Sequence, residues 1–323
     1  MKTWIKGCLS AAMLAVGAFG AQVAPAIAAD YPTRNVNLII PFPPGGGVDT
    51  VGRVIAQKLS EALGQPVVVV NRPGAGSVIG VRDAAKAAPD GYTILMLVTG
   101  ASLPANTGYD LAKDFTPIGL IASIPIVIMS NPDVPVKTMT DIVALAGKEP
   151  GKITIGTPPS PTLNYFGAEQ FKSMTGADVI VVPYKGTGPL TNDLLGGHVM
   201  IGFNTLPPAI GNIQAGKIRA IAVAAPERLA AIPNVPTTAE SGLKGLDIVQ
   251  YYGLVAPAGT PKPIIARLNT ELRKIVNSEN IKKRIVSDGG GPVASTPEEY
   301  AANIQREEGK WAALIKKLGL VVN

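Results

Sequence analysis

The chain has 323 residues, of which 46% are hydrophobic and 16% are charged. So large an apolar share can build a substantial core, which excludes an intrinsically disordered protein. Glycine and proline make up about a fifth of the residues without a regular repeat, which indicates many tight turns. The net charge is +6, but the basic residues form no run and aromatic residues are scarce at 5%, so we expect no nucleic-acid partner.

The first 28 residues predict a signal peptide that is cleaved on export. Lys2 and Lys6 precede an apolar run over residues 9–21, and small residues at alternating positions follow it. This run is too short to span a bilayer. Cleavage would lower the net charge to +4 and remove Cys8, the only cysteine. We therefore expect a soluble exported protein without a disulfide.

The mature chain alternates strands and helices, the pattern of an α/β protein with largely parallel sheets. Strands are predicted at residues 36–40, 67–70, 92–98, 152–155, 179–182, 199–203 and 218–224. Helices are predicted from the glycine-rich loop to residue 63 and at residues 78–88, 162–174, 206–214, 263–276, 280–287 and 297–317. Two α/β units follow one another, and each opens with a strand, an unusual loop and a helix.

Two apolar extended stretches, residues 121–129 and 246–257, flank the second unit. If both cross between the units, the chain leaves the first domain, builds the second and returns. Two crossings make a hinge that permits closure over a ligand. Two independent domains joined in series are the alternative.

The first loop, residues 43–50, reads Pro-Pro-Gly-Gly-Gly-Val-Asp-Thr and lies between a strand and a helix. Three glycines leave backbone N–H groups unshielded, and the start of the helix adds its positive dipole end, so the loop can hold a carboxylate or phosphate. We expect Asp49 to cap the helix or organise the loop, although it could instead contact an amino or hydroxyl group of the ligand. The alternative is a purely structural turn. The glycine spacing does not match G-x-G-x-x-G and no phosphate-loop lysine is present, which argues against a nucleotide site.

The second loop, residues 156–162, also precedes a helix. Thr157, Ser160 and Thr162 supply hydroxyl donors, whereas each proline in the loop removes a backbone N–H. A capping role is the alternative for Thr162.

Enzyme chemistry finds no support in the sequence. There is no G-x-S-x-G motif, and His198 is the only histidine, which excludes a multi-histidine metal centre. We expect no catalytic residue, no cofactor and no bound metal.

A series of motifs in register resembles the periplasmic substrate-binding receptors of tripartite tricarboxylate transporters, also called Bug-type receptors. The motifs run along the mature chain in order: residues 31–32, 41–49, 71–76, 89–93, 109–110 with 114–115, 183–186, 216–220, 256–261 and 310–311.

This resemblance implies a two-domain periplasmic-binding-protein type II fold, or Venus flytrap, with a two-crossing hinge. Residues 29–125 and 252–323 would form domain 1, and residues 126–251 domain 2. By the same likeness Phe42 would wall the pocket, Thr99 would approach from the third strand, and Asn204 would contact the far part of the ligand. The ligand-binding residues expected in all are Phe42, Gly45, Gly46, Gly47, Asp49, Thr99, Thr157, Ser160, Thr162, Tyr165 and Asn204.

The sequence departs from the family pattern in the second loop and at two positions after it. Pro159 and Pro161 replace glycines, Tyr165 stands at a histidine position, and Asn204 stands where aspartate is common. These changes remove donors, so we expect a ligand with a more apolar or aromatic body than citrate.

The resemblance implies a monomeric periplasmic receptor that delivers a di- or tricarboxylate or an aromatic acid to integral membrane subunits of a tripartite transporter. An exported hydrolase or lyase, or a receptor that presents its ligand to a membrane sensor kinase, is the alternative.

Overall fold

The structure is a computed structural model that describes residues 31–100 and 107–320. The predicted signal peptide lies outside the described residues. The strands are β1 Val36–Ile40, β2 Val67–Asn71, β3 Thr93–Val98, β4 Phe115–Ser130, β5 Ile153–Thr157, β6 Val179–Pro183, β7 Ile201–Thr205, β8 Arg219–Ala224, β9 Val249–Pro257 and β10 Gly291–Pro292. The helices are α1 Gly47–Leu63, α2 Val78–Ala85, α3 Leu111–Asp114, α4 Met139–Lys148, α5 Leu163–Thr175, α6 Thr187–Leu195, α7 Ile210–Gln214, α8 Lys262–Asn277, α9 Glu279–Ser287 and α10 Pro297–Leu318, with a short 3-10 helix, η2, at Ala75–Ser77.

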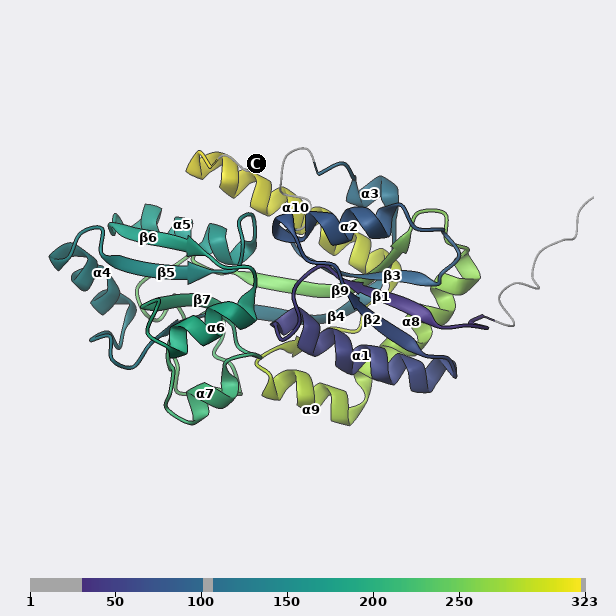
Figure 1. The fold of residues 1–323 in the computed structure, drawn as a ribbon, viewed down its shortest axis with the longest axis horizontal. Coiled ribbons are helices and arrows are strands. Elements are labelled where there is room, and N and C mark those ends of the chain that lie inside the picture. The colour runs from purple at the N-terminus through teal and green to yellow at the C-terminus, as the bar shows by residue number, and fades with distance from the viewer. Residues whose placement is uncertain (1–30, 101–106, 321–323) are drawn as a thin grey trace, which may run out of the picture.

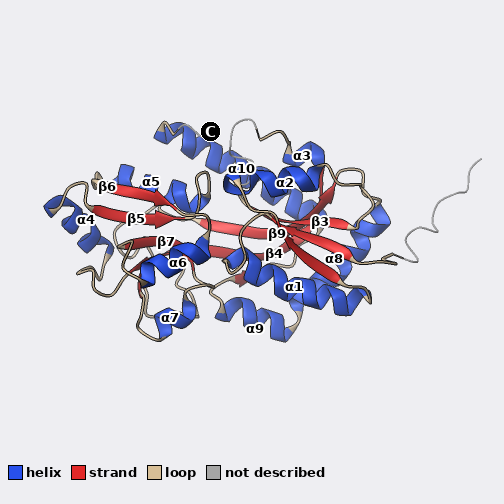
Figure 2. Ribbon diagram, viewed as in Figure 1, coloured by secondary structure: helices blue, strands red, loops and turns tan. Residues whose placement is uncertain are grey.

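The predicted α/β class is confirmed. Helices lie on both sides of one long sheet with the strand order β2-β1-β3-β9-β4-β7-β5-β6, and β8 and β10 pair with β4 (Figures 1 and 2). Each predicted strand is found within two residues of its expected bounds. Two predicted helices are shorter than expected, and α3, α4 and α6 form where no helix was predicted.

The prediction of largely parallel sheets is wrong for the centre of the molecule. Pairing is parallel at the two ends of the sheet, where β1 joins β2 and β3, and where β5 joins β6 and β7. In the centre, β4 and β9 are antiparallel to each other and to their other neighbours. These are the two apolar stretches predicted to flank the second unit, and they run side by side between the two ends (Figure 1).

The buried apolar residues fall into clusters on either side of one point along β4 and β9. The largest cluster draws on residues 31–124 and 252–285, and the next on residues 126–248 together with Trp311 and Ile315. We refer to the parts packed around these two clusters as the first half and the second half. Helix α10 begins on the first half and ends against the second, since Trp311 is buried there (Figure 1).

Helix α1 shows how the sequence places the site. Val51, Ile55, Leu59 and Leu63 recur at helical spacing and are buried against the sheet. Gly64 ends the helix in the left-handed conformation, with φ of 70°. The apolar stripe therefore fixes the axis of α1 and directs its N-terminus to the carboxyl end of β1.

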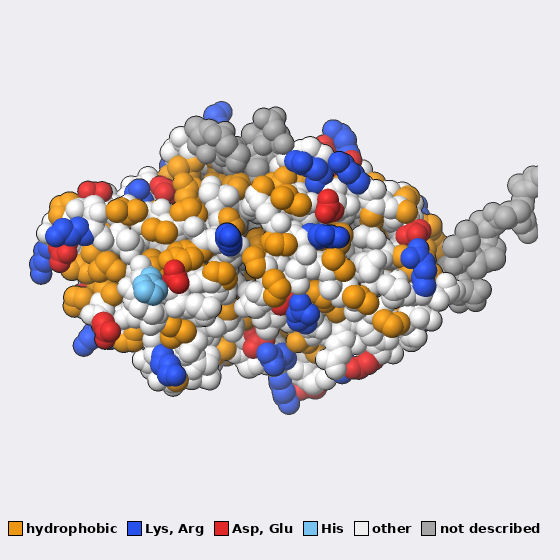
Figure 3. Space-filling model, viewed as in Figure 1, with side chains coloured by type: hydrophobic (Ala, Val, Ile, Leu, Met, Phe, Trp, Pro, Cys, Tyr) orange, Lys and Arg blue, Asp and Glu red, His pale blue; other side chains and the backbone are white. Residues whose placement is uncertain are grey.

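Charged side chains of both signs are interspersed over the face shown in Figure 3. Of the helices in the described ranges, none is both long and apolar enough to cross a membrane.

Candidate ligand-binding site

A cavity with about 570 Å³ of space not filled by atoms, part of it open to solvent, lies between the two halves. The cavity adjoins the carboxyl ends of β1, β3 and β5, the edge of an α/β sheet where ligands commonly bind. Its lining residues are Phe42, Pro43, Gly46, Val48, Gly76, Ser77, Val98, Thr99, Gly100, Pro158, Pro161, Thr162, Leu163, Asn164, Gly186, Thr187, Gly188, Pro189, Gln250 and Tyr252. None of these residues carries a charge.

Four helix N-termini converge on this cavity. Gly46 and Val48 belong to the start of α1, Ser77 precedes α2, Leu163 opens α5 and Thr187 opens α6. The first N–H groups of a helix have no partner within it, and the helix dipole makes them attractive to anions. The cavity is therefore suited to a small anion although no lysine, arginine or histidine lines it.

The starts of α1 and α6 contact each other across the two halves. The amide of Gly47 donates a hydrogen bond of 3.1 Å to the hydroxyl of Thr187. A Cβ atom at Gly46 would lie 2.6 Å from Thr187 Oγ1, and one at Gly47 would lie 2.7 Å from Thr205 Oγ1. The glycines of the first loop thus permit an approach that any other residue would block.

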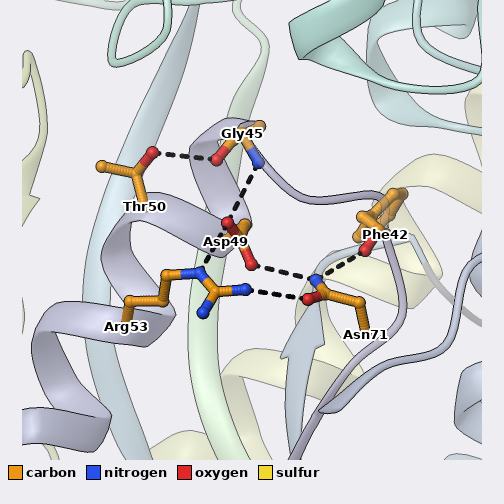
Figure 4. Close-up of polar contacts among 7 residues, drawn as sticks. Phe42, Gly45, Asp49, Thr50, Arg53 and Asn71 are labelled. Atoms are coloured by element: carbon orange, nitrogen blue, oxygen red, sulfur yellow. Dashed lines mark hydrogen bonds and ion pairs between the residues drawn. The ribbon is translucent and has the colours of Figure 1, made fainter. Parts of the chain in front are cut away.

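Asp49 organises the first loop, which is one of the two roles expected for it (Figure 4). Its Oδ2 atom accepts hydrogen bonds from the Gly45 amide at 3.0 Å and from Arg53 Nε at 2.9 Å, and its Oδ1 atom accepts one from Asn71 Nδ2 at 2.9 Å. Asn71 Nδ2 also donates to the carbonyl of Phe42 at 3.0 Å. Burial opposes the charge, but the hydrogen bonds from Arg53, Asn71 and Gly45 outweigh it and hold the pKa of Asp49 below its usual value.

The starts of α2 and α5 also meet across the two halves. A Cβ atom at Gly76 would lie 2.8 Å from Pro161 Cδ. Ser77 occupies the N-cap position of α2 but makes no side-chain capping bond, and its φ is 110°. Its side chain is buried, and Oγ has no hydrogen-bond partner among the described residues.

Three side chains joined by hydrogen bonds, those of Asn164, Gln250 and Tyr252, form part of the polar wall. Gln250 Nε2 donates to Asn164 Oδ1 at 2.6 Å, and the hydroxyl of Tyr252 donates to Gln250 Oε1 at 3.2 Å. Asn164 Nδ2 in turn donates to the carbonyl of Phe203 at 3.0 Å. Burial raises the pKa of Tyr252, so its hydroxyl stays protonated. This network links β9 to α5 and keeps the wall neutral.

The structure brings four of the expected ligand-binding residues to the cavity: Phe42, Gly46, Thr99 and Thr162. The hydroxyl of Thr99 is already bonded to the backbone of Tyr251. Thr162 is the N-cap of α5, as its alternative role predicted, since its hydroxyl accepts from the Tyr165 amide.

The other expected residues are not in the lining. Gly45, Gly47 and Asp49 lie in the loop and first turn that support the wall. Thr157 ends β5 with a fully buried hydroxyl that has no partner in the described residues, and Ser160 is exposed.

Tyr165 and Asn204 lie behind the wall, in the second half. The ring of Tyr165 packs edge-to-face on Phe166 at 5.8 Å. Asn204 is 0% exposed and supports α6: its Nδ2 atom donates to Thr191 Oγ1 at 2.9 Å and to the carbonyl of Thr187 at 3.3 Å.

The start of α6 and Ser77 line the cavity but were not among the residues expected from the sequence. The run Gly186-Thr187-Gly188-Pro189, followed by leucines at residues 190 and 194, carries the signal of a helix start. Ser77 could have been noticed as a hydroxyl residue directly before a predicted helix. Tyr252 of β9 is buried and is also part of the wall.

No group of three or more His, Cys, Asp or Glu side chains that could hold a metal occurs within residues 31–100 and 107–320. The site offers helix N-termini, hydroxyls and amides, all suited to hydrogen bonding with an acceptor-rich ligand.

Comparisons with known proteins agree with this geometry. Residues 51–320 match the family model described as "Tripartite tricarboxylate transporter family receptor". Protein BugT of Bordetella pertussis is 35% identical over 302 residues, which cover 92% of this chain and 93% of BugT. The structure of R. palustris Rpa4515 with adipate is similar with a TM-score of 0.87 and 32% identity, over 90% of this chain and 99% of that one. The structure of MatC from Rhodopseudomonas palustris with bound malate has a TM-score of 0.83 and 29% identity, over 88% of this chain and all of that one. The fold is therefore that of the periplasmic binding proteins, as predicted, and the chain belongs to the tripartite tricarboxylate transporter receptor family.

Proposed function

We propose that this chain captures a small organic carboxylate between its two halves and delivers it, without chemical change, to the integral membrane subunits of a tripartite tricarboxylate transporter. Its family consists of substrate-binding receptors. The observation that carries the proposal is the convergence of four helix N-termini on a cavity without a charged side chain. Such a cavity attracts an anion through backbone dipoles.

The ligand class follows from how the helix starts are grouped. The N-termini of α1 and α6 contact each other across the two halves, and so do those of α2 and α5. The cavity therefore offers two places for a negative group. The apolar surface between these polar groups comes from Phe42, Val98, Leu163 and several prolines. We therefore favour a dicarboxylate with an apolar middle, with an aromatic acid as second choice. The adipate and malate in the two similar structures support a dicarboxylate.

Capture requires the halves to move as domains. We assign residues 29–125 and 252–323 to one domain and residues 126–251 to the other. The division of the large apolar clusters near residues 125 and 251 supports this assignment, with the end of α10 as an added contact. A ligand that touches both halves favours the closed arrangement by its differential contacts.

The site of action follows from the sequence and the family. A signal peptide at residues 1–28 would export the chain to the periplasm, where it would act as a monomer.

Thermal-shift and calorimetric titration of the mature chain, residues 29–323, tests the proposal. The protein is first unfolded, dialysed and refolded to remove copurified ligand, then screened with adipate, malate, citrate, benzoate, glutamate and NADPH. A ligand at a hundred times its Kd adds about 2.7 kcal/mol to the free energy of unfolding and raises Tm.

We expect a shift with one class of carboxylate, and NMR of the mixture should show the acid unchanged after prolonged incubation. Tightest binding of malate or citrate would refute the apolar-body expectation. A shift with NADPH alone, or turnover of the acid, would refute the receptor function.

A further inference from the structure

Among the described residues that line the cavity, Ser77 is the one whose side chain has a buried polar atom without a hydrogen-bond partner. Serine at an N-cap normally accepts a hydrogen bond from the second or third amide of its helix. Ser77 makes no such bond, although it holds the N-cap position of α2. Its Oγ atom is buried without a partner among the described residues, and the side chain is 2% exposed.

The backbone holds Ser77 in this position at a conformational cost. Four consecutive residues, from Gly74 to Ser77, have positive φ, and at Ser77 the value is 110°. This region is unfavourable for a residue with a Cβ, so the backbone at Ser77 is strained. A strained residue that also leaves a buried hydroxyl unbonded is expected where a ligand completes the bonding.

The neighbourhood of Ser77 favours an anionic acceptor. Ser77 directly precedes the first turn of α2, and the positive end of this helix dipole attracts negative charge. Gly76 lies against Pro161 of the opposite half, so this part of the wall is made by both halves. No carboxylate side chain lines the cavity to compete for the hydroxyl proton.

We propose that Ser77 is a specificity-determining residue whose hydroxyl donates a hydrogen bond to a carboxylate oxygen of the ligand between the starts of α2 and α5. This inference rests on the proposed capture of a carboxylate. It places one carboxylate of the ligand at the Ser77 hydroxyl. It also gives the positive φ values of residues 74–77 a role in ligand recognition.

Two substitutions separate the hydroxyl from the backbone. Ser77→Ala removes the hydroxyl but keeps the Cβ atom and the strained φ, whereas Ser77→Gly removes both the hydroxyl and the strain. The matched control is Ser130→Ala: Ser130 is also fully buried with an unpartnered Oγ, but it ends β4 and does not line the cavity.

The experiment measures Tm without ligand and Kd by calorimetry for adipate and for malate, using the acid that the wild type binds more tightly. We expect both Ser77 variants to bind it about tenfold or more weakly, because a hydrogen bond to a charged group is lost. Ser77→Gly should also raise the ligand-free Tm, and Ser130→Ala should leave Kd unchanged.

Binding by Ser77→Ala within twofold of the wild type would overturn the role of the hydroxyl. A loss of affinity in Ser77→Gly alone would overturn it as well, since the backbone would then be the cause. If the wild type binds no acid of the panel, the proposed function fails, and that result is distinct from failure at Ser77.

Discussion

The amide of Gly47 and the hydroxyl of Thr187 are hydrogen-bonded at 3.1 Å although 140 residues separate them in the chain. One belongs to the first turn of α1 in the first half and the other to the first turn of α6 in the second half. The bond therefore exists only while the halves are together, and it lies at the edge of the cavity. It links the proposed closure to the proposed ligand site.

Substitution of Gly46 tests this contact without disturbing the local backbone. Gly46 has φ of −84°, which alanine adopts freely, but its added Cβ would lie 2.6 Å from Thr187 Oγ1. We expect Gly46→Ala to bind its carboxylate at least tenfold more weakly, because the halves cannot close fully. The ligand-free urea midpoint should change little.

A double-mutant cycle supplies the control. Thr187→Ala removes the clashing hydroxyl along with the hydrogen bond, so the double variant Gly46→Ala/Thr187→Ala should bind no more weakly than Thr187→Ala alone. Additive losses in Kd would show that Gly46 acts through something other than Thr187.

Asn204 should matter for stability. It is fully buried, donates to Thr191 and to the carbonyl of Thr187, and accepts a bond from the Thr205 amide. Asn204→Leu removes all three bonds and leaves the Thr205 amide without its acceptor, although the Thr191 hydroxyl keeps its bond to the Thr187 carbonyl. We expect a loss of about 1–3 kcal/mol in the free energy of unfolding. Urea denaturation of the ligand-free protein measures it.

The matched control is Asn192→Leu, at an exposed position on α6. It should change the free energy of unfolding by no more than about 0.5 kcal/mol. Equal effects of the two substitutions would contradict the supporting role of Asn204.

The sequence predicts the elements better than the site because the two depend on different contacts. Alternating apolar runs and turn residues determine β1, α1 and β5 locally, and these agree within a few residues. The antiparallel centre depends on how β4 and β9 pair over long separations, which periodicity does not report. The resemblance to the family correctly placed Phe42 and Thr99 at the cavity. Ser77 differs from other serines in its positive φ and its unbonded hydroxyl, and both properties depend on the three-dimensional structure, which the sequence pattern does not report.

Ligand affinity should depend weakly on salt. The lining holds no charged side chain, so binding relies on short-range hydrogen bonds and helix dipoles inside a partly enclosed cavity, where screening is limited. We expect Kd for the bound acid to change by less than about threefold between 20 and 300 mM NaCl, measured by calorimetry at constant pH.

Lys185→Gln is the control for the salt titration, because Lys185 is exposed beside Gly186 but does not line the cavity. Its Kd should match that of the wild type at every salt concentration. A tenfold salt effect that disappears in this variant would mean that Lys185 pairs with the ligand.

Asp49 should make the first loop sensitive to acid. Hydrogen bonds from Arg53, Asn71 and Gly45 lower its pKa in the folded protein despite burial, whereas in the unfolded chain the pKa is about 3.9. The charged carboxylate therefore adds stability above the unfolded pKa, and this stability is lost as the pH falls through the lower folded pKa. Asp49→Asn should have a lower Tm than the wild type at pH 7, and the difference should shrink steadily between pH 5 and pH 3.

Asp133→Asn, on the surface, controls for the loss of one negative charge. A Tm difference that stays constant from pH 7 to pH 3 would mean that the geometry of the Asp49 side chain, and not its charge, holds the loop.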